Sequence, residues 1–294
     1  MHTLHGFCTP LKGKRLDCMI KLIATDMDGT FLDGQGSFDR ERFSRVLDQL
    51  DQKKIPFVIA SGNGIGRLLQ LCQGFEQRLI FVADNGAHVY QNGQTMIRRA
   101  IQQEEVEAIL HFFKGRWADV CLMLSNDGNI YMQAGAGMPF AGTDLPIESA
   151  QMAAFQNRVT YLDDLSAYPV SESIYKVGLW VPEARVDKIT EAFNQAFHGQ
   201  LVAVTSGYGS VDILPQGIHK AWGLEQVLTG LDIEPEQVMA FGDSDNDIEL
   251  LSYVGYSYAM ENATDKVKAV AKYMAPSHLE AGVLQVLEEH VLQR

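Results

Sequence analysis

The segment Leu22-Ile23-Ala24-Thr25-Asp26-Met27-Asp28-Gly29-Thr30 decides the fold, because in it a short apolar run ends directly at two carboxylates. Residues 22–25 are typical of a buried parallel strand. An isolated Asp-x-Asp pair is usually a solvated acidic turn. Here Gly29 allows the chain to turn after the strand, so that both carboxylates can face one site. One of them could then act as a nucleophile while the other moves a proton.

Three more apolar runs along the chain are also followed directly by small or acidic residues. These runs are Ile55–Ala60 before Ser61-Gly62-Asn63, Leu79–Ala83 before Asp84-Asn85-Gly86, and Val238–Phe241 before Gly242-Asp243. Apolar residues at helical spacing lie between the runs, as at Phe43–Leu50 and Leu224–Leu228. Strands that alternate with helices predict an α/β fold with a doubly wound parallel sheet. Because ligands bind at the carboxyl ends of such strands, we expect Asp26, Ser61 and Asp243 at one edge.

The long stretch Ala87–Ser210 follows a different pattern. A helical face is followed by two strand-like runs that flank Asn126-Asp127-Gly128, a tight-turn signal, and then by a strand, a helix and a strand. This pattern predicts a separate α+β domain inserted into the sheet domain. The expected divisions are an N-terminal extension at 1–18, a core domain at 19–86 and 211–294, and the inserted domain at 87–210.

Charge, cysteine content and hydropathy argue against several classes of partner and of cellular location. The chain has 294 residues and a net charge of −13, without a run of Lys and Arg, which argues against nucleic acid or an anionic membrane surface as partner. Its four cysteines lack metal-binding spacing and are typical of a reduced cytoplasmic protein. No apolar stretch approaches the ~20 residues of a membrane span. Residues 1–18 lack the apolar centre of a signal peptide, and Met19 is a plausible alternative start.

A second acidic segment, Gly242-Asp243-Ser244-Asp245-Asn246-Asp247, also follows an apolar strand. Asp243 and Asp247 would share one face if a helix begins there. Oxygen ligands from two strand ends suit Mg²⁺, which also binds phosphate. The hydroxyl and backbone N–H groups of Ser61-Gly62-Asn63, ahead of a predicted helix, suit a phosphate oxygen. Lys220 is placed in the chain order to supply a cation to these carboxylates.

These motifs together resemble the haloacid dehalogenase superfamily, in particular its Cof-like sugar-phosphate phosphatases. The resemblance runs from about Ile20 to the C-terminus. The first motif is Asp26–Thr30, the second is Ser61-Gly62, the third is Lys220 and the fourth is Gly242–Asp247. The first two are close in the sequence and the second and third are far apart, which resembles the group with a large α/β cap between the second and third motifs. Asn85-Gly86-Ala87 and Tyr208-Gly209-Ser210 resemble the two hinges of that cap.

The resemblance also implies roles for individual residues. Asp26 would be the nucleophile that forms an aspartyl-phosphate, and Asp28 would protonate the leaving alcohol and later activate water. The residues that would hold phosphoryl oxygens or substrate are Thr30, Ser61, Gly62, Lys220 and Asn246. The Mg²⁺ ligands would be the Asp26 carboxylate, the Asp28 backbone carbonyl and Asp243, with Asp247 as a further ligand or as the residue that positions the metal waters or Lys220. One departure is Asn63, where many relatives have Arg.

These expectations favour a magnesium-dependent phosphatase of small soluble phosphate monoesters, such as sugar phosphates. The first alternative is a phosphomutase, which shares the nucleophile and the acid/base pair. The large cap favours a hydrolase over a mutase. A non-enzymatic phosphosugar-binding protein is the second alternative, and the presence of both Asp26 and Asp28 argues against it.

Overall fold

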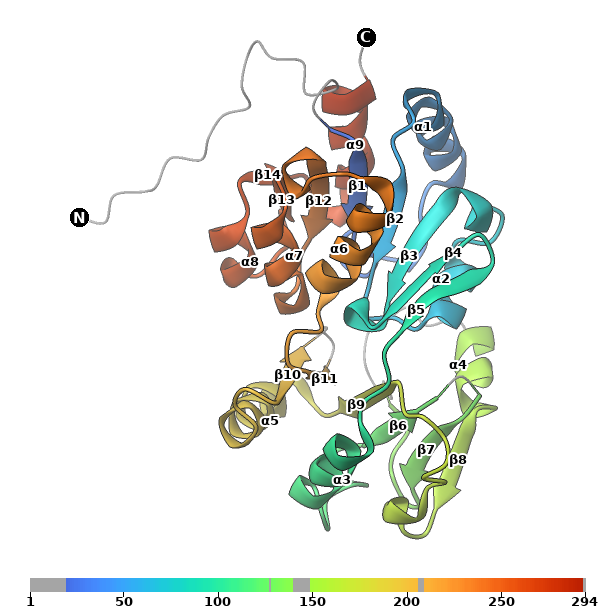
Figure 1. Ribbon diagram of the computed structural model, residues 1–294, viewed down its shortest axis with the longest axis vertical. Helices are drawn as coiled ribbons and strands as arrows, with labels where there is room; N and C mark the ends of the chain where they lie inside the picture. Colours follow the sequence, from blue (N-terminus) through green and yellow to red (C-terminus); the bar gives the residue numbers. More distant parts are fainter. Residues whose placement is uncertain (1–19, 127, 140–148, 206–208, 293–294) are drawn as a thin grey trace, which may run out of the picture. The chain divides into compact units, whose positions relative to one another are not determined.

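The computed structural model describes residues 20–126, 128–139, 149–205 and 209–292 (Figure 1). The chain divides into two compact units. The core unit comprises Met1–Met96 and His219–Arg294, and the cap unit comprises Ile97–Ile218. The predicted α/β fold with an inserted α+β unit is confirmed. The expected extension at 1–18 lies outside the described residues.

The core unit contains an eight-stranded sheet in the order β14-β13-β12-β1-β2-β3-β4-β5. Its strands are β1 (Leu22–Thr25), β2 (Phe57–Ala60), β3 (Leu79–Ala83), β4 (His88–Gln91), β5 (Gln94–Arg98), β12 (Val238–Gly242), β13 (Tyr256–Met260) and β14 (Tyr273–Ala275). All pairings from β14 through β3 are parallel, and every residue of β1, β2, β3, β12 and β13 is buried. Complete burial explains why these strands consist mainly of apolar residues.

Helices of the core unit lie between these strands in the sequence, and the last one follows β14. They are α1 (Arg40–Lys53), α2 (Ile65–Leu71), α6 (Lys220–Leu231), α7 (Ile248–Tyr253), α8 (Asp265–Val270) and α9 (Gly282–Leu287). The predicted apolar face of α1 is buried at Phe43, Val46, Leu47 and Leu50. The Asp39 side chain accepts a hydrogen bond from the backbone N–H of Arg42 and so caps the start of α1.

The cap unit contains a six-stranded sheet in the order β10-β11-β9-β6-β7-β8. Its elements are α3 (Gln103–Phe112), β6 (Met123–Ser125), β7 (Ile130–Gln133), α4 (Ser149–Gln156), β8 (Val159–Leu162), β9 (Lys176–Trp180), α5 (Glu183–Ala196), β10 (Leu201–Thr205) and β11 (Ser210–Pro215). The strand pairings are antiparallel except for β7 with β8. The residues on either side of the predicted turn join β6 to β7, although Asp127 itself lies outside the described residues.

The boundaries of the inserted unit differ from those expected. β4 pairs with β3 in antiparallel register from Ala83↔His88 to Ile80↔Gln91, so the residues that follow Gly86 still belong to the core sheet. At the other end, β11 pairs with both β10 and β9, which places residues 211–215 in the cap sheet. The sequence pattern marked the turns that precede β4 and β11, whereas strand pairing decides to which sheet each strand belongs.

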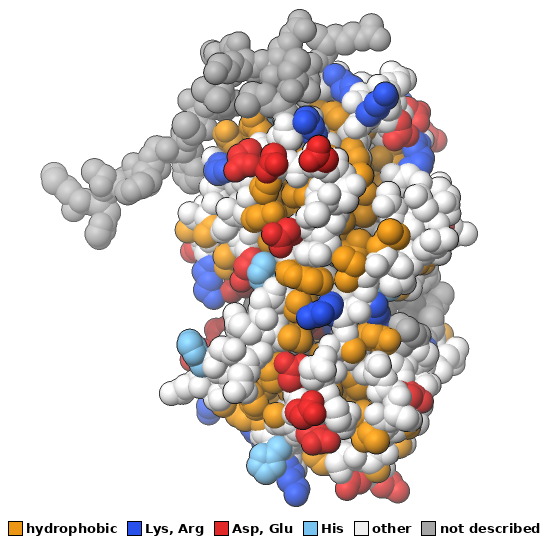
Figure 2. Space-filling view, viewed as in Figure 1, with side chains coloured by type: hydrophobic (Ala, Val, Ile, Leu, Met, Phe, Trp, Pro, Cys, Tyr) orange, Lys and Arg blue, Asp and Glu red, His pale blue; other side chains and the backbone are white. Residues whose placement is uncertain are grey.

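The surface carries charges of both signs. Figure 2 shows Lys and Arg side chains in small groups on one face, with Asp and Glu side chains near them rather than one continuous basic surface. Among the described residues, every helix is too short or too polar to cross a lipid bilayer.

Candidate active site

The polar residues predicted to gather at one sheet edge do lie together. β1 is the central strand, with β12 on one side and β2 on the other, and Thr25 is in register with both Phe241 and Ile59. Asp26, the residue after β1, therefore lies beside the carboxyl ends of β12 and β2. Its backbone N–H still donates to the Phe241 carbonyl at 3.1 Å, which continues the strand pairing to the site itself.

Lys220 connects Asp26 to Asp247. Its Nζ lies 3.0 Å from Oδ1 of Asp26 and 2.6 Å from Oδ1 of Asp247. The Lys220 and Asp247 side chains are fully buried, and Asp26 is 5% exposed. Lys220 is the first residue of α6, where the ring Nδ1 of His219 accepts the backbone N–H of Trp222 as the helix cap. His219 is thus structural, while Lys220 provides the predicted cation.

Burial and charge act in opposite directions on these groups. Burial raises the pKa of Asp26 well above its usual value, the Lys220 charge lowers it, and the Asp247, Asp243 and Asp28 charges raise it further. Burial alone would lower the pKa of Lys220, but the charges of Asp247 and Asp26 outweigh this effect, and the net shift is upward. Lys220 therefore stays protonated, yet one cation leaves the surrounding carboxylates incompletely neutralised.

Asp243 is held by hydroxyl groups from two loops. Oγ1 of Thr30 donates to Oδ1 of Asp243 at 2.7 Å, and Oγ of Ser244 donates to Oδ2 at 3.2 Å. Thr30 thus contacts Asp243, and its predicted contact with phosphate or substrate stays a prediction. Burial, followed by the Asp247 charge, raises the pKa of Asp243 to about 7. Gly29 has a φ of +73°, and a Cβ there would collide with the Asp243 carboxylate, so this close approach requires glycine.

Asp247 shapes the loop that follows β12. Its Oδ2 accepts the backbone N–H groups of Asp243 at 3.0 Å and Ser244 at 3.1 Å, while its Oδ1 binds Lys220. Gly242 allows the Asp247 side chain to lie against the strand end, because a Cβ at position 242 would overlap it. Both oxygens of Asp247 thus have partners within the protein.

Three of the predicted acidic residues form a cluster that suits a divalent cation. Side-chain oxygens of Asp26, Asp243 and Asp247 all lie within 4.8 Å of one another. The available ligands are carboxylate oxygens, which bind hard cations such as Mg²⁺. Burial, followed by the charges of neighbouring carboxylates, raises the pKa values of Asp26 and Asp243, so a cation bound here would stabilise their ionised forms. The residues present therefore fit a divalent metal.

The side chain of Asp28 binds Asn63, which follows Ser61-Gly62, and Arg67 of α2. Nη2 of Arg67 lies 2.9 Å from Oδ1 of Asp28, and Nδ2 of Asn63 lies 2.5 Å from Oδ2. Asn63 also donates to Oγ of Ser61 from its backbone N–H at 3.2 Å and from Nδ2 at 3.1 Å. Gly62 lies within this same turn, ahead of α2. Ser61, Asn63 and Asp28 are thus brought together, whereas the contact of Arg67 was missed by sequence reasoning.

Helical spacing does not relate Arg67 to Asn63. Asn63 precedes the cap residue Gly64, whereas Arg67 lies in the first turn of α2. We interpreted it only as part of a predicted helix. The position of its guanidinium beside Asp28 depends on the turn at residues 61–64, which no local pattern specifies.

Asn246 and Asn85 form a buried hydrogen bond at the edge of the site. Nδ2 of Asn246 donates to Oδ1 of Asn85 at 2.9 Å, and the backbone N–H of Asn85 donates to the Ser61 carbonyl at 3.0 Å. Asn246 is therefore linked to the Ser61 turn, and its predicted contact with phosphate or substrate stays a prediction. The expected hinge at residues 85–87 packs on α6, since a Cβ on Gly86 would collide with the His219 carbonyl. Tyr208 of the second expected hinge lies outside the described residues.

A model of the haloacid dehalogenase-like hydrolase family matches residues 23–287. This chain belongs to that family. It is 33% identical to the 5-amino-6-(5-phospho-D-ribitylamino)uracil phosphatase YbjI of Escherichia coli (strain K12), over 92% of this chain and 96% of the relative. It is 25% identical to the HMP-PP phosphatase of Serratia proteamaculans (strain 568), over 86% and 88% of the two chains.

The fold of this chain is also seen among solved structures. SMU.1108c from Streptococcus mutans UA159 has a TM-score of 0.81 and 34% identity, covering 93% of this chain and all of that one. The prediction that this chain is a Cof-like phosphatase of this superfamily is confirmed. The chain is accordingly a phosphoric monoester hydrolase.

Proposed function

We propose that this hydrolase removes phosphate from small soluble phosphate monoesters through covalent catalysis by Asp26, with Mg²⁺ as cofactor. The observation that carries the proposal is the position of Asp26. Asp26 directly follows the central strand β1, and its side chain is almost completely buried. Its carboxylate lies 3.0 Å from the Lys220 ammonium and belongs to a cluster of three carboxylates. A buried, positioned carboxylate beside a cation is suited to attack an electrophilic phosphorus.

The proposed reaction has two steps. In the first, an Asp26 oxygen bonds to phosphorus, the bond from phosphorus to the ester oxygen breaks, and Asp28 gives a proton to the leaving alcohol. In the second, Asp28 takes a proton from water, whose oxygen attacks phosphorus and releases Asp26. Ser61, Gly62 and Lys220 would bind phosphoryl oxygens. The two donors on Asp28, from Arg67 and Asn63, hold its side chain near the Ser61 turn.

The metal would be held by Asp26, the Asp28 backbone carbonyl and Asp243. When bound, Mg²⁺ supplies the positive charge that allows a phosphate dianion to approach a carboxylate. The structure favours a supporting role for Asp247, since both of its oxygens already bind Lys220 and the loop amides. Thr30 and Ser244 would orient Asp243 as a ligand through their hydrogen bonds to it.

For the substrate we propose a small phosphorylated metabolite, either a sugar phosphate or a cofactor-related phosphate. Support comes from the named activities of the two phosphatase relatives, one of which acts on a phosphorylated ribitylamino-uracil. A phosphomutase is less favoured, because the inserted unit follows the second motif and these relatives are named phosphatases. We also propose that the enzyme acts in the cytoplasm. The two described cysteines support this, since both are buried thiols without a disulfide.

Phosphate release by the purified full chain tests the proposal. The panel would include 5-amino-6-(5-phospho-D-ribitylamino)uracil, hexose and pentose phosphates, a nucleotide and p-nitrophenyl phosphate, each with Mg²⁺ and with excess chelator. We expect turnover of small metabolites that depends on the metal and is lost in Asp26→Asn. Equal turnover by Asp26→Asn, or full turnover in chelator, would contradict the proposed chemistry.

A further inference from the structure

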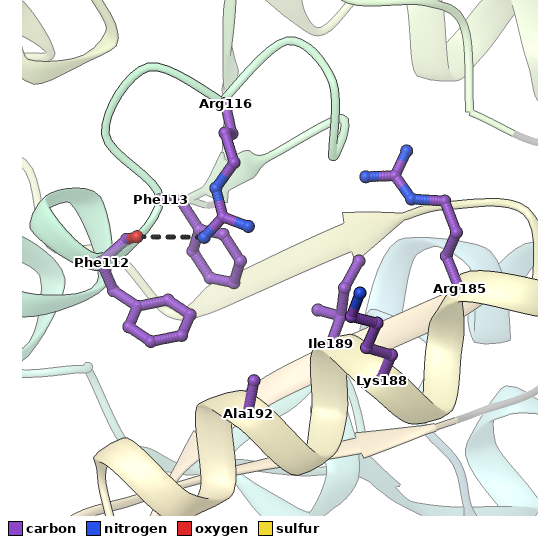
Figure 3. A pocket seen from close by; sticks show the side chains of 7 residues that line it. All are labelled: Phe112, Phe113, Arg116, Arg185, Lys188, Ile189 and Ala192. Carbon is purple, nitrogen blue, oxygen red and sulfur yellow. Dashed lines mark hydrogen bonds between the residues drawn. The ribbon is translucent and has the colours of Figure 1, made fainter.

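The cap unit contains a small cavity that none of the proposed catalytic residues lines. It lies between the end of α3, the turn that follows α3, and one side of α5 (Figure 3). Its volume is about 260 Å³. The lining residues are Phe112, Phe113, Arg116, Arg185, Lys188, Ile189 and Ala192. Because all of them belong to the cap unit, the cavity is defined within that unit alone.

Three cationic side chains surround this cavity, and one carboxylate, Asp119, interacts with two of them: the hydrogen bond and charge of Arg185 and the charge of Arg116 all lower the pKa of Asp119. Arg185 forms a two-pronged ion pair with Asp119, at 3.0 Å from Nη1 to Oδ1 and 2.6 Å from Nη2 to Oδ2. Across the described part of the chain, no carboxylate lies within ion-pair distance of Arg116 or Lys188. In a chain with a net charge of −13, two such cations at one cavity favour an anionic ligand.

The remaining lining is apolar and aromatic. Phe113 is fully buried and Ile189 is nearly so, which leaves Phe112 and Ala192 to complete an apolar wall. The Arg116 guanidinium lies 5.8 Å from the centre of the Phe112 ring and donates to the Phe112 carbonyl at 3.3 Å. These contacts hold one cation close to an aromatic face. A cavity with apolar walls and a few convergent charged groups is the usual form of a small-molecule site.

We propose that this cavity binds a small aromatic or heteroaromatic anion. The anionic group would lie between Arg116 and Lys188, and the flat ring would lie against Phe112 and Ala192. The volume lies just below the usual range for ligand sites, which limits the ligand to about one or two rings. A carboxylate and a phosphate share the required charge, so the ring and the negative charge together define the ligand class.

Calorimetric titration of the full chain with naphthalene-2-sulfonate tests this site. The probe has two fused rings and a permanent anion, and the proposed hydrolysis cannot consume it. We expect saturable one-site binding, with a shift of the Ile189 methyl signals in NMR spectra. Sodium sulfate, which lacks the ring, and 2-naphthol, which lacks the sulfonate, should each bind at least about tenfold more weakly, a difference of about 1.4 kcal/mol.

Single substitutions assign the binding to the cavity. Arg116→Ala and Lys188→Ala should each raise the Kd of the probe about tenfold, as expected for loss of a charged hydrogen bond. Both side chains are exposed, so folding should be retained. Lys114→Ala is the matched control, because Lys114 is an exposed lysine of the same unit that does not line this cavity. Ala192→Phe should weaken probe binding without changing the charge.

Several outcomes would overturn the proposal. These are no saturable binding by the wild-type chain, an unchanged Kd in both Arg116→Ala and Lys188→Ala, or equal binding of sodium sulfate. Asp26→Asn should bind the probe as the wild type does, because this inference is independent of the proposed hydrolysis. Its failure and the failure of the proposed function are therefore separate results.

Discussion

Arg67, in the first turn of α2, and Asp28, in the loop after β1, form an ion pair. Nη2 of the guanidinium lies 2.9 Å from Oδ1 of the carboxylate. Both side chains are only partly exposed, at 30% and 28%. Asn63 occupies the second carboxylate oxygen of Asp28. Asp28, the residue proposed to transfer protons, is thus oriented by Asn63 and by Arg67 of α2, and this arrangement leads to the first prediction.

Arg67→Ala should impair hydrolysis most where Asp28 is most needed. An alkyl phosphate has a poor leaving group, so misplacement of Asp28 should lower kcat about 10- to 100-fold. With p-nitrophenyl phosphate, whose leaving group needs little protonation, the loss should be small. Arg67→Lys should recover part of kcat for the alkyl phosphate. Arg45→Ala, at an exposed arginine of α1, serves as control. Equal losses for both esters would indicate a general structural effect instead.

Asp26→Asn should abolish turnover while the chain stays folded. An amide cannot supply the attacking oxygen, although its shape is similar. Thermal stability above neutral pH should be maintained or increased, because burial and neighbouring carboxylates disfavour the ionised Asp26. Steady-state phosphate release and a thermal unfolding scan provide the measurements. Residual turnover above a small fraction of the wild-type rate would remove Asp26 from the nucleophile role.

Without divalent metal, stability should fall as the pH rises from about 4 to about 7. The pKa of Asp243 is raised to about 7, so the folded chain keeps a proton that the unfolded chain has already released. Stabilisation by that proton is complete below the unfolded pKa and is lost as pH rises through the folded pKa. Unfolding midpoints of wild type and Asp243→Asn in chelator measure this trend. The variant should show a flatter profile, and an equally steep one would contradict the assignment.

Mg²⁺ should activate the enzyme and also stabilise it. Binding of the metal to the folded chain alone adds about 2.7 kcal/mol at 100 times its Kd, so the unfolding temperature should rise with Mg²⁺ concentration. Asp243→Ala should lose both effects. Ca²⁺ should inhibit, because its looser shell would let both Asp26 oxygens bind the metal. Normal turnover with Ca²⁺ would argue against attack by a free Asp26 oxygen.

Gly29→Ala should lower both activity and stability. Position 29 has a φ of +73°, and the added methyl group would collide with the Asp243 carboxylate. We expect a loss of about 1–3 kcal/mol in the free energy of unfolding together with weaker Mg²⁺ activation. Gly66→Ala in α2 is the matched control, since no atom lies within 4 Å of a Cβ there. That substitution should be neutral or slightly stabilising, and both effects can be read from denaturant titration.

The sequence alone determined the fold class and the principal acidic residues. Short apolar runs that end in acidic or small residues predict buried parallel strands, and such strands bring their carboxyl ends to one edge. Asp26, Ser61 and Asp243 were therefore predicted together, and the structure places them at that edge. This inference succeeds because strand burial and strand order are visible in local residue patterns.

Only the tertiary structure decided the partners of these residues. The pairs Arg67 with Asp28 and Thr30 with Asp243 depend on how loops turn after different strands, as do the boundaries set by β4 and β11. The cationic cavity between α3 and α5 likewise joins residues from two separate helices. Contacts between segments remote in sequence arise from strand pairing and helix packing. Local residue patterns therefore do not predict which of these side chains meet or how far apart they lie.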